Sequence, residues 1–130
     1  MQTIKTSYFP YPRRPNNIFS MWDYKLDVSN LAEIIEAFYN IKHLDLYRWK
    51  FGDFKNPLKI GKDIKFNIKG LDLRWVTGLD LNKMQTIVHG LALNESLVNS
   101  LEYVWVTGTR VNIEQLQLMF TIQHFNVLIC

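Results

Sequence analysis

The chain has 130 residues, of which 48% are hydrophobic and 21% charged, with a net charge of +3. This composition excludes a disordered tail and a collagen-like rod, and the length predicts one domain rather than two. The single cysteine, Cys130, excludes an internal disulfide framework and a cysteine-rich zinc module, and no run of 18 apolar residues is present to span a membrane.

Residues 1–22 predict an extended basic and aromatic arm that precedes a folded domain over 23–130. Proline alternates with aromatic residues between positions 7 and 15, a composition typical of polyproline-like backbone. Two placements are open: the arm caps its own domain, or it inserts into a neighbouring protein. The candidate contact residues are Tyr8, Phe9, Tyr11, Arg13 and Arg14.

The compartment is predicted from two weak signals. A lone cysteine fits a reducing interior, which favours the cytoplasm. The first 22 residues are basic and contain no acid, as in a mitochondrial presequence, but their prolines forbid the amphipathic helix that such a segment needs. Mitochondrial targeting is therefore the alternative.

Three helices are expected along the domain. The first begins at Asn30, where Glu33 follows as in a capping box, and carries an apolar stripe up to Phe38. The second covers residues 81–92, and the third begins at Asn112. Residues 57–63 predict a short helix or turn, and alternation over 66–74 predicts an extended strand.

A strand motif recurs between these helices. It has the form apolar-x-x-Leu-x-Leu, and its central leucines lie 27, 30 and 27 residues apart, at Leu44, Leu71, Leu101 and Leu128. Residues 71–78 align without a gap on 101–108, and 44–52 match them with one insertion. This alignment also places Gly78 and Gly108 at one turn that needs positive φ. Because alternate residues point to opposite faces, we expect the leucines in a common core and Asp45, Asp72 and Glu102 in water.

The repeated helix–strand unit resembles the leucine-rich repeat family, in its ribonuclease-inhibitor-like subclass, over residues 30–130. The resemblance implies an α/β fold: a short right-handed solenoid with parallel strands on one face and helices on the other. The chain departs from the family after each strand, where Trp49, Val76 and Val106 replace the usual Asn or Cys. A two-layer α/β sandwich with antiparallel strands is the alternative.

The sequence offers little for catalysis. His43, His89 and His124 share no ligand spacing, and Cys130 has no acid–base partner nearby. We expect no metal, no cofactor and no small-molecule substrate. The three acidic positions predict a stripe for a basic protein partner more readily than an acid–base site. Trp75 and Trp105 share one register in this alignment and are expected to pack in the turn layer or to form a binding ridge.

Charge is unevenly distributed along the chain. Residues 42–69 carry eight basic and three acidic side chains, a net +5 that allows nucleic-acid binding. The spacing of these lysines is more typical of a solvated surface, and no stacking aromatic residues interleave with them.

The sequence therefore predicts a non-enzymatic protein–protein interaction module, an accessory or scaffold subunit of a larger intracellular assembly. Docking is expected through the arm and the strand face. The alternatives are a substrate adaptor of the ubiquitin-ligase type and a nucleic-acid-associated protein. The strand-face residues expected to bind the partner are Asp45, Tyr47, Asp72, Arg74, Glu102 and Val104.

Overall fold

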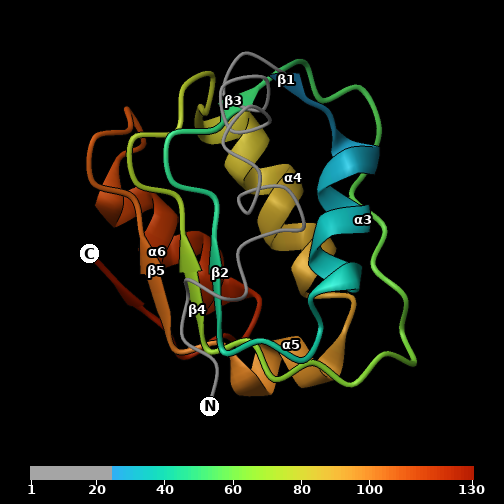
Figure 1. Ribbon diagram of the computed structural model, residues 1–130. Coiled ribbons are helices and arrows are strands. Elements are labelled where there is room, and N and C mark those ends of the chain that lie inside the picture. The colour runs from blue at the N-terminus through green and yellow to red at the C-terminus, as the bar shows by residue number, and fades with distance from the viewer. Residues whose placement is uncertain (1–24) are drawn as a thin grey trace.

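The computed structural model describes residues 25–130 (Figure 1). This part of the chain is of the mixed α/β class and has a four-stranded sheet in the order β2-β4-β5-β6, with a second sheet of β1 and β3. The strands of the larger sheet are β2 (His43–Asp45), β4 (Gly70–Asp72), β5 (Tyr103–Trp105) and β6 (Leu128–Ile129). Those of the smaller sheet are β1 (Lys25–Leu26) and β3 (Lys50–Phe51).

Four helices connect these strands within residues 25–130, and each begins at a polar capping residue. They are α3 (Val28–Ala37), α4 (Leu81–Leu91), α5 (Glu95–Ser100) and α6 (Ile113–Ile122). The prediction for α6 is confirmed, because Asn112 accepts a hydrogen bond from the backbone N–H of Gln115 at 2.9 Å. Helix α3 begins three residues earlier than expected, at the N-cap Asp27, whose carboxylate accepts from the N–H of Asn30 at 2.9 Å.

All strand pairs in the larger sheet are parallel, which contradicts the antiparallel alternative. The predicted pairing of Leu44 with Leu71 is confirmed. The predicted register of β5 is wrong by three residues, since Leu71 pairs with Val104 rather than Leu101. In β6 the paired residue is Ile129 rather than Leu128, so successive partners are 27, 33 and 25 residues apart.

The same turn follows three of the strands, and it corrects the repeat alignment. An i to i+3 backbone hydrogen bond closes each turn, from Trp49 to Leu46 (3.1 Å), from Val76 to Leu73 (3.3 Å) and from Thr109 to Val106 (3.0 Å). The residue before each donor has positive φ, at Arg48 (65°), Trp75 (59°) and Gly108 (81°). These three residues are therefore equivalent, and the first turn needs no insertion.

Gly78 also has positive φ, as expected, but it is not the counterpart of Gly108. A Cβ atom there would overlap the carbonyl oxygen of Phe51. Glycine is needed at Gly78 because β3 passes against the backbone.

The core lies between the larger sheet and the helices. Figure 1 shows α4 and α6 on one side of the strands. Alternate strand residues enter this core together with the inner faces of α3, α4 and α6; they include Leu44, Leu46, Leu71, Leu73, Val104 and Val106. The opposite face of the sheet carries the remaining strand side chains, and no described helix covers it.

Residues 52–69 cross the helix layer without regular secondary structure, so the short helix or turn expected at 57–63 is reduced to a turn at 62–63. The buried side chain of Asn94 holds this segment: its amide donates to the carbonyls of Gly61 and Ile64, both at 2.8 Å. The same side chain caps α5 by accepting from the N–H of Leu97 at 3.1 Å. One residue thus anchors both the crossing segment and a helix.

Candidate functional site

The candidate site is the face of the larger sheet that points away from α4 and α6. Its register places side chains in two rows across the strands. The first row is His43, Gly70, Tyr103 and Leu128, and the second is Asp45, Asp72 and Trp105. Cys130 extends the second row, because its N–H donates to Val104 and its carbonyl accepts from Val106, both at 2.9 Å.

Three rings gather at the centre of this face, and we call His43, Tyr103 and Trp105 the aromatic cluster. Tyr103 and Trp105 stack with their centroids 5.5 Å apart and 16° between their planes. The His43 ring lies 6.4 Å from Tyr103 and 6.0 Å from Trp105. All three are partly exposed, so their ring surfaces are available for further contacts.

Gly70 makes the cluster possible. A Cβ atom at this position would lie 2.5 Å from Cδ2 of His43 and 2.9 Å from an indole carbon of Trp105. Strand β4 lies between β2 and β5 (Figure 1), so the rings on these two strands meet across the bare backbone at Gly70. Glycine is required here by close approach of side chains rather than by its own φ.

A charged group lies beside the aromatic cluster. Asp45 and Asp72 are in register, as predicted, but they are buried, with 7% and 1% of their surface exposed. Each ends its strand in the same way, because Asp45 accepts from the N–H of Tyr47 (2.8 Å) and Asp72 from that of Arg74 (3.0 Å). The expectation that both acids face water is wrong because they serve the turn backbone.

Arg74 ties this group together. Its Nη2 and Nε donate to the Asp72 carboxylate at 2.7 to 3.1 Å. These hydrogen bonds raise the pKa of the guanidinium above its ordinary value. Its carbon Cζ lies 5.6 Å from the ring centre of Tyr47, which is a cation–π distance. Arg74 and Tyr47 remain exposed and form a polar border to the aromatic cluster.

Two predicted site residues do not belong to this face. Val104 is fully buried and packs in the core, because the shift of β5 by an odd number of residues exchanges its two faces. Glu102 lies before β5 and forms an ion pair with Lys69 at 3.2 Å instead of extending the row of Asp45 and Asp72. The predicted acidic stripe is therefore limited to two residues.

The tryptophans also occupy different places from those expected. Trp49 is buried in the core, whereas Trp75 is 53% exposed and its ring covers Gly108. Trp75 belongs to the turn and Trp105 to the strand, so they share no register and form no common ridge.

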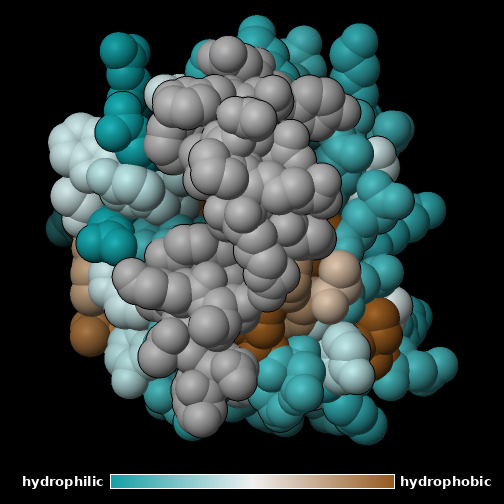
Figure 2. Space-filling view, viewed as in Figure 1, coloured by the Kyte–Doolittle hydropathy of each residue, from teal (hydrophilic) through white to brown (hydrophobic). Residues whose placement is uncertain are grey.

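The basic residues of 42–69 do not line a groove with aromatic side chains of the kind that binds single-stranded nucleic acid. Lys55, Lys59, Lys62 and Lys65 are exposed along the irregular crossing segment, and Lys69 is paired with Glu102. Hydrophilic residues dominate the right-hand side of Figure 2, over α3 and this segment. This arrangement is that of a solvated surface.

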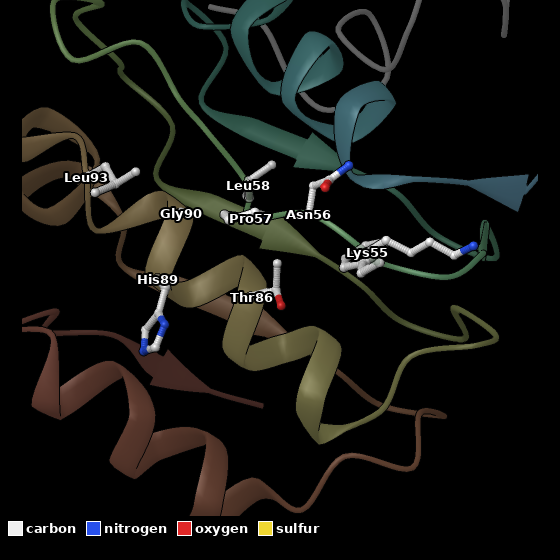
Figure 3. Close-up of a pocket in the computed structure, with 9 residues that line it drawn as sticks. Lys55, Asn56, Pro57, Leu58, Thr86, His89, Gly90 and Leu93 are labelled. Carbon is white, nitrogen blue, oxygen red and sulfur yellow. The ribbon is translucent and has the colours of Figure 1, made fainter.

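A shallow groove of about 470 Å³ lies on the helix side of the molecule (Figure 3). Residues 54–58 form one wall, and the other wall is formed by Thr86, His89 and Gly90 of α4 together with Leu93, which lies just beyond the end of this helix. His89 and Lys55 extend away from each other in Figure 3, and the described residues that line the groove include no carboxylate. Its walls therefore provide no acid–base pair.

Within residues 25–130, no cluster of three or more histidine, cysteine, aspartate or glutamate side chains could hold a metal ion. No helix in the same part of the chain is long and apolar enough to cross a membrane. The predicted contact residues of the arm, Tyr8 to Arg14, lie outside the described residues.

Sequence reasoning missed the aromatic cluster, although its members were visible. Tyr103 and Trp105 alternate along the chain, which indicates one face of a strand, but the neighbouring Val104 and Val106 alternate as well. Gly70, immediately before Leu71, was a usable signal, because glycine within a strand marks close approach of other groups.

No known protein family, curated protein or solved structure matches this chain.

Proposed function

We propose that this chain is a non-enzymatic protein-binding module that docks a partner protein on the face of its larger sheet that points away from α4 and α6. The observation that carries the proposal is the aromatic cluster, three stacked and partly exposed rings over Gly70. Trp, Tyr and Arg are the residues that most often dominate the energy of protein interfaces. Here Arg74 and Tyr47 border Trp105 and Tyr103 on one surface.

The proposed partner presents an apolar centre and polar edges. Leu128, 61% exposed, extends the row of Tyr103 and enlarges the apolar area of the face. Arg74 is already paired with Asp72, so the two aspartates carry less free charge than the sequence indicated. The partner is therefore expected to make hydrophobic and stacking contacts first, and charge contacts only at the border.

We also propose that the fold is a short solenoid of the leucine-rich-repeat kind. Three equivalent turns, each with a residue of positive φ and an i to i+3 hydrogen bond, support a repeated unit. In the corrected register Thr109, not Val106, takes the position where the family carries Asn. Its hydroxyl donates to the carbonyl of Val106 at 2.6 Å, which is a comparable turn-satisfying role. Such arrays commonly bind proteins on their strand side.

The test is co-purification of the tagged full chain from its native source, with stoichiometric companions quantified. The face variant Tyr103→Ala/Trp105→Ala is compared with the helix-side variant Leu118→Ala/Ile122→Ala, whose side chains are exposed on α6. The proposal predicts loss of the companion from the face variant and retention by the helix-side variant, with both variants folded. Retention by both, or loss only from the helix-side variant, would contradict it.

A further inference from the structure

We propose that the shallow groove between residues 54–58 and α4 is a second docking site, which binds an acidic peptide segment of a partner protein. The peptide presents apolar side chains flanked by carboxylates. The groove lies on the helix side of the molecule, so the inference concerns a surface other than the face of the aromatic cluster.

Packing at both ends of residues 54–58 holds the wall of the groove in place. At one end Leu58 lies against Gly90, where a Cβ atom would come within 2.5 Å of the Cβ of Leu58, so glycine is needed for this close approach to α4. At the other end the ring of Phe54 stacks on that of Phe51, with their centroids 5.6 Å apart. The groove is therefore already formed, and a ligand loses little free energy in ordering it.

The groove offers apolar surface that the fold covers only in part. Phe54 is partly exposed, Pro57 is exposed, and Leu93 has 48% of its surface exposed. Figure 3 shows Leu93 at one end of the groove and Lys55 at the other. A ligand that fills the groove is therefore expected to bring apolar side chains to its centre.

The charges around these apolar side chains are basic. Among the described residues, the lining includes Lys55 and His89 and no carboxylate, and Lys55 has no ion-pair partner within residues 25–130. Residues 53–65 carry four lysines and two aspartates, and α4 adds Lys83 and no acid. The Nζ of Lys83 lies 5.9 Å from the ring centre of Phe54, beside the groove. Carboxylates on the ligand would complement this border.

The shape of the groove favours a peptide over a small molecule. Small-molecule sites enclose about 70–90% of the surface of their ligand, whereas this groove is shallow. Thr86 and Leu93 are about two helical turns apart, which is about 10 Å, so a short peptide can span the groove and place acidic side chains at its border. Residues 1–22 of this chain contain no acid, so their composition does not match the groove.

The test is an NMR titration of the isotopically labelled full chain with synthetic peptides. The acidic probe is Glu-Glu-Leu-Leu-Glu-Glu-Leu-Leu-Glu-Glu, and its two controls replace every glutamate by lysine or every leucine by serine. We expect the acidic probe to shift the amide signals of the groove residues with a Kd below about 1 mM. Neither control peptide should shift them at the same concentration.

Two pairs of variants separate charge from apolar contact. Lys55→Glu should weaken binding of the acidic probe about fivefold, whereas Lys65→Glu, an exposed lysine of the same segment outside the groove lining, should change it no more than about twofold. Leu93→Ala should also weaken binding about fivefold. Its control Leu118→Ala, an exposed leucine of α6, should leave binding unchanged.

Four results would overturn the proposal. They are no shift with the acidic probe, equal binding of the lysine control, shifts confined to the sheet face, and equal effects within either pair of variants. Shifts of the groove signals with octanoate but not with the acidic probe would assign the groove to a small carboxylate instead. Groove signals that move when the chain alone is diluted would assign it to a second copy. None of these results bears on the companion experiment above, whose variants lie outside the groove.

Discussion

Gly70 lies directly beneath the indole of Trp105, with room for no more than a hydrogen atom between them. A Cβ on Gly70 would lie 2.9 Å from one indole carbon, and 2.5 Å from Cδ2 of His43 on the other side. The rings cannot both keep their positions if this residue gains a side chain. The geometry of the aromatic cluster thus depends on one residue that has no side chain of its own.

Gly70→Ala is expected to destabilise the fold by about 1–3 kcal/mol, because His43 and Trp105 must move from their packed positions. Denaturant unfolding followed by circular dichroism measures this loss. Gly52→Ala is the matched control and should change stability less, since the closest contact of its Cβ outside the adjacent residues would be the Cβ of Lys25 at 3.3 Å, followed by the carbonyl oxygen of Leu26 at 3.8 Å. Equal losses for the two variants would show that the rings are not packed over Gly70.

Gly108→Ala is expected to cost about 1–2 kcal/mol for the positive φ alone, and more because the new Cβ would overlap the ring of Trp75. The double variant Gly108→Ala/Trp75→Ala removes the overlap but keeps the backbone strain. The double variant should therefore lose less stability than the sum of the losses of the two single variants. A double-mutant cycle measures this difference. Simple additivity would contradict the contact between Trp75 and Gly108.

Asn94→Ala is expected to destabilise the protein by about 2–3 kcal/mol. The variant removes the hydrogen bonds of this side chain to the carbonyls of Gly61 and Ile64 and to the N–H of Leu97, although Ile64 keeps the hydroxyl of Ser96 and Leu97 keeps the carbonyl of residue 94. Asn112→Ala removes an exposed N-cap and should cost about 1 kcal/mol. A loss for Asn94→Ala no larger than that for Asn112→Ala would mean that segment 52–69 is not anchored by this side chain.

Asp27 should contribute stability that depends on pH. Hydrogen bonds from the backbone of Asn30 and the hydroxyl of Ser29 lower its pKa below the ordinary value of 3.8. The carboxylate of Asp27 therefore binds a proton more readily in the unfolded chain than in the folded protein. Its stabilisation is fully present above pH 3.8 and is lost as the pH falls through the lower pKa of the folded state.

The measurement is the difference in unfolding midpoint between the natural chain and Asp27→Asn. This difference should be constant near neutral pH and should change as the pH falls below 3.8. A difference that is independent of pH down to the acid transition would contradict the lowered pKa.

The elements with one unambiguous amphipathic pattern were predictable from the sequence. The apolar stripe and capping residue of α6 specify its start, and Leu44-x-Leu46 and Leu71-x-Leu73 specify the inner faces of β2 and β4. Their parallel pairing was expected from the repeated strand motif, and it occurs without a helical connection, because residues 52–69 between them contain no regular secondary structure.

The register of β5 could not be predicted in the same way. Leu101, Tyr103 and Trp105 form one apolar alternation, and Val104 and Val106 form another, so the hydrophobic pattern supports both registers. The choice is made by α5, which ends with Leu101 as its C-cap and leaves Tyr103 to begin the strand. This error in the register of β5 also affected the predicted site, because it placed Val104 on the exposed face of the sheet and Trp105 on the buried face.

The burial of Asp45 and Asp72 has a different origin. The alternation of apolar and polar residues along β2 and β4 correctly places the two aspartates on the face opposite the core. It does not indicate what their carboxylates bind. In the structure each carboxylate accepts from a backbone N–H two residues later, a local interaction that a strand pattern does not express.

The most direct test of this account is the register between β4 and β5, measured as NMR couplings across backbone hydrogen bonds. We expect couplings from the N–H of Leu73 to the carbonyl of Trp105 and from the N–H of Trp75 to that of Thr107, a pairing that places Trp105 beside Asp72 on the face of the aromatic cluster. A coupling from the N–H of Leu73 to the carbonyl of Glu102 would instead pair Leu71 with Leu101 and remove the aromatic cluster from that face.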